Sequence, residues 1–165
     1  RKMRTLDFLN LDESKVANVT KGLNQLLADF QVFYTNLRGF HWNVKGKGFF
    51  ILHSKFEELY DDAAAKIDEI AERILQLDAV PESKFSKYLE TANIKETGIT
   101  ACSREAVGNV LDMLKELIRQ ERALLKTAAE AGDEVTVALL SDYLKSQEKT
   151  VWMLVAFSTK KTTDA

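Results

Sequence analysis

Cysteine and proline are almost missing from this chain of 165 residues, which contains one of each, Cys102 and Pro81. A single cysteine excludes a disulfide bond within the chain and is usual for proteins of reducing compartments. One proline and only seven glycines leave room for long, uninterrupted helices.

Long hydrophobic runs are also missing. The longest, residues 48–52 and 151–157, are too short to cross a bilayer, so we expect no membrane partner. No secretory signal pattern opens the sequence, so the expected location is the cytoplasm. With 23 basic and 25 acidic residues the net charge is −2, which gives no general attraction to nucleic acid. Basic residues do gather at both ends: Arg1, Lys2, Arg4, Lys160 and Lys161. These tails suggest weak DNA binding and association with the nucleoid.

Helical periodicity is present in four segments, and no segment alternates as a strand does. The first covers residues 11–40, with Asn10 or Asp12 as its cap, and the second covers residues 49–77. The third starts near Ser103 as its cap and stops at Gly132, and Asp133 caps the fourth. A crossover at 78–100 contains Pro81 and one short helical turn near 84–89. Two helical hairpins joined by a long crossover predict an all-α, ferritin-like four-helix bundle, formed as a single domain from residues 1–165 with short basic tails.

The second predicted helix has an unusual outer face. Its core stripe is centred near Leu52, Ala63 and Ile70. Four metal-competent side chains fall within an arc of about 100° on nearly the opposite side: His53, Glu57, Asp68 and Glu72. A solvated face is the simpler interpretation, and a pair such as Glu69 with Arg73 is ordinary there. However, His53 and Glu57 are four residues apart, as are Asp68 and Glu72, so that each pair presents two ligands on one face.

The distance between the two pairs points to a second copy of the chain. Glu57 and Asp68 are eleven residues apart, which is about 16 Å along a helix, whereas metal–ligand bonds are about 2.0–2.2 Å. One helix therefore cannot bring both pairs to one metal. An antiparallel copy could do so if a two-fold axis crossed the helix near residues 62–65, where small alanines allow close approach. This predicts a homo-oligomer with metal sites at a two-fold interface.

His41 completes the predicted ligand set, because it ends the first helix just before the turn that leads to His53. Imidazole together with carboxylates suits iron, manganese or zinc, and few protein ligands leave positions open for reaction. Trp42 and Tyr60 nearby favour iron, since oxidation chemistry would explain them, although aromatic residues at helical spacing more often serve only in packing. An ordinary ferritin site is excluded, because it needs Glu-x-x-His on two helices, and we expect no matching carboxylates in the core stripes of the last two helices.

These motifs resemble the Dps family, the DNA-binding proteins from starved cells. The resemblance rests on His41-Trp42-Asn43-Val44-x-Gly46, on Leu52-His53 and on Asp68-x-x-Ala71-Glu72-Arg73. A later match at Glu148-Lys149-x-x-Trp152-x-Leu154 extends it over essentially the whole chain.

The resemblance implies a hollow dodecamer that oxidises ferrous iron, usually with hydrogen peroxide, and stores the ferric product as a mineral, protecting DNA and the cell. It assigns His41, His53 and Glu57 to one subunit and Asp68 and Glu72 to its partner. Two positions depart from the family pattern: Glu57 is often aspartate, and Ala138 replaces the middle acid of the iron-entry pore. The alternatives are a non-enzymatic nucleoid protein that coats DNA and binds metal structurally, and a helical adhesin or immune-modulating protein.

Overall fold

The computed structural model describes residues 2–160, in which one 3-10 helix and five α-helices follow one another and no strand forms. The elements are η1 (Thr5–Phe8), α1 (Glu13–Asn43), α2 (Phe49–Gln76), α3 (Phe85–Thr91), α4 (Ser103–Glu130) and α5 (Glu134–Ser158). The four long helices and the short α3 correspond to the predicted segments, within a few residues at each end.

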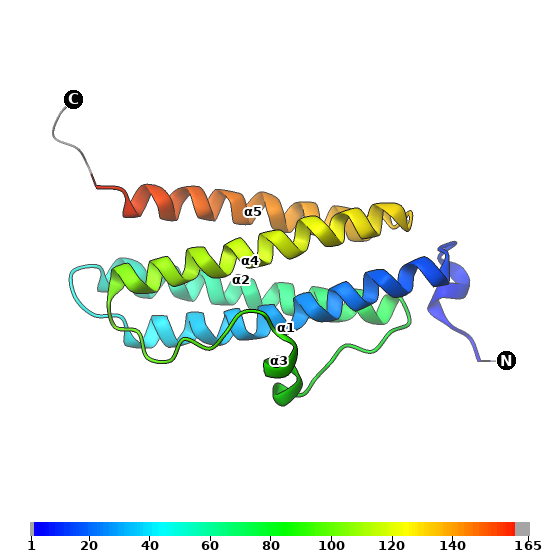
Figure 1. Ribbon diagram of the computed structural model, residues 1–165, viewed down its shortest axis with the longest axis horizontal. Coiled ribbons are helices and arrows are strands. Elements are labelled where there is room, and N and C mark those ends of the chain that lie inside the picture. Colours follow the sequence, from blue (N-terminus) through cyan, green and yellow to red (C-terminus); the bar gives the residue numbers. More distant parts are fainter. Residues whose placement is uncertain (1, 161–165) are drawn as a thin grey trace, which may run out of the picture.

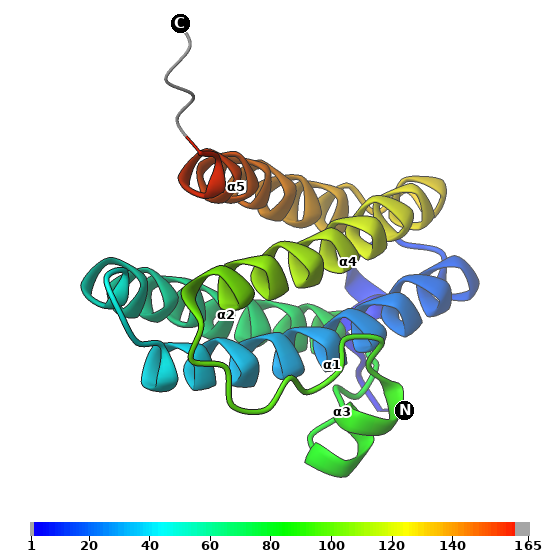
Figure 2. The ribbon, with the colours of Figure 1, turned by 60° about the vertical axis from the view of Figure 1, so that its left-hand side comes forward.

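The long helices form two hairpins, α1–α2 and α4–α5, joined by the crossover that contains α3 (Figure 1). Helix α1 packs against α2, α4 and α3, and α4 packs against α5. Figure 2 shows α3 lying beside α1, outside the bundle of long helices. The predicted all-α, ferritin-like bundle with a long crossover is confirmed.

The caps explain where the helices begin. The Asp12 carboxylate accepts a bond from the Ser14 N–H at 3.0 Å and starts α1. Asp133 accepts from the Thr136 N–H at 3.0 Å and starts α5, directly after Gly132 has turned the chain with a φ of 69°. The prediction that Ser103 caps the third long helix is wrong, because Cys102 occupies that position and makes no capping bond with its side chain.

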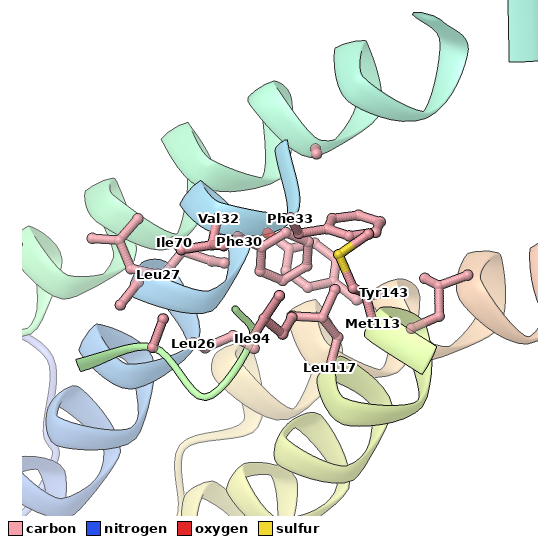
Figure 3. Close-up of a cluster of buried hydrophobic side chains, with 14 of the residues drawn as sticks. Leu26, Leu27, Phe30, Val32, Phe33, Ile70, Ile94, Met113, Leu117 and Tyr143 are labelled. Atoms are coloured by element: carbon pink, nitrogen blue, oxygen red, sulfur yellow. The ribbon is translucent and has the colours of Figure 1, made fainter. Parts of the chain in front are cut away.

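The core lies between the long helices, where large side chains from both hairpins meet (Figure 3). Phe30 packs edge-on against Phe33 and Tyr143, with ring centroids 6.1 Å apart in both pairs. Leu52, Ala63 and Ile70 are fully buried or nearly so, as the predicted core stripe of α2 requires. The opposite face of α2, with its metal-competent residues, is therefore fixed toward the outside of this bundle.

Asp29 is a buried carboxylate that holds the crossover against α1. Its Oδ1 accepts bonds from the backbone N–H groups of Asn93 and Ile94 at 2.8 and 2.7 Å. Its Oδ2 accepts from the side-chain amides of Gln25 and Gln120 at 2.9 and 2.7 Å. One carboxylate thus joins α1, the crossover and α4, and fixes how the second hairpin returns to the first.

Arg73 connects α2 to the corner between α4 and α5. The predicted surface pair of Glu69 with Arg73 is wrong, because Arg73 is buried and donates to Asp133 Oδ1 at 2.7 Å and to Thr136 Oγ1 at 3.0 Å. Glu69 instead accepts a bond from the Tyr143 hydroxyl at 3.2 Å. The C-terminal half of α2 is thereby held in a fixed rotation relative to α5.

Two further predictions concern the ends and the membrane. Arg1 and Lys161 lie outside the described residues. Arg4 is engaged by Glu13, with 2.7 Å between guanidinium and carboxylate, so part of the N-terminal positive charge is already paired. No helix within residues 2–160 is long and apolar enough to span a membrane.

Candidate metal centre

His41 and His53 meet where α1 ends and α2 begins. The turn between the helices reverses the chain through Gly46, whose φ of 97° favours glycine, and Val44 is buried beneath it. The two imidazole rings stack with centroids 3.8 Å apart and planes 12° from parallel. The prediction that His41 approaches His53 is confirmed by this geometry.

Each histidine is bonded to the backbone of the other. The Nδ1 atom of His41 lies 2.6 Å from the carbonyl oxygen of His53, and Nδ1 of His53 lies 2.8 Å from the carbonyl oxygen of His41. A carbonyl oxygen only accepts, so Nδ1 of each ring must carry the proton and donate. In the neutral ring this leaves the lone pair on Nε2, the atom that can bind a metal. The backbone thus selects the ligating nitrogen of both rings.

Aromatic side chains hold the pair in place. Phe49 stacks on His53 with centroids 4.9 Å apart, and Tyr60 lies edge-on to His41 at 5.3 Å. His41 is buried and His53 half-buried. Burial and, secondly, the negative charge of Glu57 raise the pKa of Tyr60, so the Glu57 carboxylate acts close to this ring. The rings therefore have little freedom to rotate away from the outer face of α2.

The three carboxylates do not join the histidines within one chain. Glu57, Asp68 and Glu72 are exposed along α2. Across residues 2–160, no three histidine, cysteine, aspartate or glutamate side chains gather closely enough to hold a metal ion. The structure thus brings together two of the five predicted ligands and presents the other three to the outside.

The small residues at the midpoint of α2 divide between two faces. Ala63 is fully buried in the core, whereas Ala64 and Ala65 are exposed. Ala63 therefore cannot contribute its side chain to a contact with a second copy, although it lies within the range expected to make that contact. Ala64 lies on the ligand-bearing face, between the two ligand pairs.

A cation–π chain beside the histidines is a feature that the sequence interpretation missed. The Arg38 guanidinium lies over the Tyr34 ring at 5.5 Å and over the Trp42 ring at 4.9 Å. Tyr34 in turn lies edge-on to Tyr60 at 5.8 Å. Spacing by four along α1, at residues 34, 38 and 42, is the signal that could have indicated it. Trp42 remains 63% exposed and adds an apolar surface next to the histidines.

Glu121 is a buried carboxylate that the sequence interpretation did not single out. It lies on α4 and is fully buried. Leu124, not histidine, stands three residues later, so Glu121 does not match a ferritin site and the prediction of no matching carboxylates is not contradicted. The spacing of Glu121 from Leu117 and Leu124, at four and three residues, places it on the core stripe of α4. The Glu-x-x-His motif is nevertheless missing from the sequence, so the case against an ordinary ferritin site still rests on that motif.

Known proteins are similar to this chain in sequence and in fold. Residues 20–161 match the Ferritin family, a ferritin-like domain. The DNA protection during starvation protein of Porphyromonas gingivalis is 53% identical over 157 residues, which cover 95% of this chain and 99% of that protein.

Two crystal structures extend the comparison. The Dps protein of Vibrio cholerae O1, described as a member of a broad superfamily of ferritin-like diiron-carboxylate proteins, superposes with a TM-score of 0.91 at 48% identity, over 96% of this chain and 99% of that one. A Dps protein from Bacillus brevis gives a TM-score of 0.86 at 39% identity, over 88% of this chain and 98% of that one. These matches span nearly the whole chain, and the chain belongs to the Dps family of ferritin-like proteins.

Proposed function

We propose that this protein is a ferroxidase and iron-storage subunit whose reactive site is shared by two copies. His41, His53 and Glu57 of one subunit would bind ferrous iron together with Asp68 and Glu72 of a second. The observation that carries the proposal is the stacked histidine pair, in which both Nδ1 atoms are bonded to backbone carbonyls. Such bonding prepares an imidazole to act as a ligand through Nε2.

The carboxylates support a site that spans two subunits. Their exposure on α2 leaves them free to meet another chain, and about 16 Å along the helix separates Glu57 from Asp68. An antiparallel copy related by a two-fold axis near Ala64 would bring Asp68 and Glu72 of each chain to the histidines of the other chain. Two equivalent sites would result for each pair of chains. A closed homo-oligomer is required by this proposal, and we propose the dodecamer that the family resemblance implies.

The ligand types suit ferrous iron as the substrate. Two imidazole nitrogens and carboxylate oxygens form a mixed donor set that binds iron and leaves coordination positions open. Two ferrous ions would give one electron each to hydrogen peroxide, whose O–O bond breaks. With two water molecules, the products are two ferric oxyhydroxide units and four protons, and the ferric product would be stored as mineral. Glu57, one methylene longer than aspartate, would reach further toward the metal.

DNA protection would follow from the removal of ferrous iron and peroxide together. The Porphyromonas gingivalis relative is named a DNA protection during starvation protein, which supports this role and a cytoplasmic site of action near the nucleoid. The net charge of −2 and the pairing of Arg4 with Glu13 argue against tight coating of DNA by this chain itself. A non-enzymatic coating protein would not raise the rate of peroxide consumption above that of ferrous iron and peroxide without protein.

The test compares adjacent glutamates on α2. We expect Glu57→Gln to slow peroxide-dependent oxidation of ferrous iron by at least about tenfold, as loss of a metal-site group does. Glu58→Gln is the matched control, because Glu58 is also exposed but pairs with Lys55. The Glu58→Gln variant should oxidise iron at the rate of the unmodified protein. Equal rates for the two variants, with peroxide consumption unchanged, would contradict the assignment of Glu57.

A further inference from the structure

Glu121 is an acid buried in the bundle with half of its carboxyl group unpartnered. Its exposed fraction is 0%, and its Oε2 accepts one bond, from the Gln147 side-chain amide at 2.9 Å. Its Oε1 has no hydrogen-bond partner, and neither has Oε1 of Gln147, which is 4% exposed. No basic group among the described residues forms an ion pair with Glu121. An ionised carboxylate in such a place would lack most of the compensation that burial demands.

A single proton would satisfy both orphaned oxygens. A protonated carboxyl group and a primary amide can pair as a ring, in which the amide N–H donates to one carboxyl oxygen and the carboxyl O–H donates to the amide oxygen. The first of these two bonds is already present. We propose that Glu121 is protonated in the folded protein and pairs with Gln147 in this way, forming a proton-dependent latch between α4 and α5.

The charged groups around Glu121 do not replace this proton. From α2, the Lys66 ammonium attracts the ionised form, but it is already bonded to Asp62 and to Ser146 Oγ. On α4 itself, Arg122 attracts it more weakly and pairs with Glu148 at the surface. Burial outweighs both cations and raises the pKa of Glu121 to about 8.

The other ionisable groups of this region are already hydrogen-bonded. Tyr143 on α5 donates its hydroxyl to Glu69, and nearby Glu121 contributes to raising the pKa of Tyr143, after burial and Glu69. The buried acid of α1, Asp29, is bonded by Gln120, the residue before Glu121. A metal ion would have to share this region with the Lys66 ammonium, and that repulsion favours a proton over a second cation.

A pocket borders the Gln147 side of the latch. Gln147 lines a pocket of about 290 Å³ that opens between α2 and α5 and also contains Lys66 and Ser146. Because the acid titrates near 4.5 in an unfolded chain and near 8 in the fold, the folded state keeps a proton that the unfolded state loses. Between these values the latch stabilises less as the pH rises, and titration of Glu121 alone would raise the unfolding equilibrium constant about tenfold per pH unit.

Infrared spectroscopy of the metal-free, assembled protein tests the proposal directly. The carbonyl stretch of a protonated carboxyl group is distinct from that of a carboxylate. We expect the protonated-acid band to be present at pH 6 to 7. It should disappear as the pH rises, with a midpoint pH well above the ordinary pKa range of glutamate. The band should be absent in Glu121→Gln. Glu130→Gln, the same change at an exposed position of α4, should retain the band.

A second variant covers the case in which Glu121→Gln fails to assemble. Gln147→Leu removes the amide acceptor, so the band should persist but shift to the higher frequency of a free carboxyl group. Lack of any protonated-acid band at pH 6 in the unmodified protein would overturn the proposal, and so would a band that survives in Glu121→Gln. A bound metal that disappears in Glu121→Gln would show a cation in place of the proton. None of these readouts depends on iron oxidation.

Discussion

Replacing Asp133 by alanine should be the most damaging change at the corner where α2 meets α5. Asp133 has two roles: it accepts the Arg73 guanidinium at 2.7 Å, and it caps α5 through the Thr136 N–H at 3.0 Å. Its exposed fraction is 1% and that of Arg73 is 7%. Removal of the carboxylate therefore leaves a buried cation without its counter-ion and a helix start without its cap.

The two losses can be estimated separately. Breaking a buried ion pair by removal of one partner costs about 3–5 kcal/mol, because the remaining charge stays buried. Loss of an N-cap side chain costs about 1 kcal/mol more. The sum of about 4–6 kcal/mol is comparable with the whole stability of many domains, so Asp133→Ala should unfold at much lower denaturant concentration.

Guanidinium unfolding followed by circular dichroism measures this effect, at one protein concentration because the proposed assembly would contribute to stability. Asp12→Ala is the matched control, since Asp12 caps α1 in the same way but is exposed and pairs with no buried cation. The loss of stability in Asp12→Ala should be clearly smaller than that in Asp133→Ala. The double variant Arg73→Met with Asp133→Ala should recover part of the loss, since no buried charge remains unpaired. If Asp133→Ala costs no more than Asp12→Ala, the buried pair is not what holds the corner.

Two other predictions concern assembly and DNA. Ala64→Arg should leave the helix content intact but prevent close approach of α2 to its copy, which light scattering would show as smaller particles. The control Ala64→Ser should assemble normally. Full assembly of the arginine variant would place the two-fold contact elsewhere. DNA binding should be weak, confined to low salt, and lost when residues 1–3 and 160–165 are removed; retention at high salt without both ends would refute the role of the tails.

The bundle is predictable because its pattern is local. Periodic apolar residues and the caps Asp12 and Asp133 define the helices within a few positions, and the core stripe of α2 follows from spacing alone. The outer face of α2 is predictable by the same arithmetic. Helical spacing is therefore enough to group His53 with the three carboxylates of that face, and the short turn after α1 is enough to add His41.

The features that escape prediction depend on contacts between distant parts of the chain. Spacing by four makes Arg73 look like a surface partner of Glu69, but its partner, Asp133, lies sixty residues away. Asp29 bonds the backbone of the crossover, and no local pattern marks those donors. Glu121 and Gln147 cannot be paired from spacing for a related reason, since a buried polar pair becomes visible only when both helices are placed.

Co-expression of two inactive variants tests the shared site most directly. His53→Ala and Asp68→Ala, carried on differently tagged chains, should each assemble and oxidise ferrous iron slowly. In a mixed two-fold pair, one site carries both lesions and the other carries neither, so in a random mixture about one quarter of all sites should be intact. The account therefore predicts that co-assembled protein recovers about a quarter of the unmodified rate. Mixed assemblies of confirmed composition that stay as slow as either parent would show that the ligands do not cross between subunits.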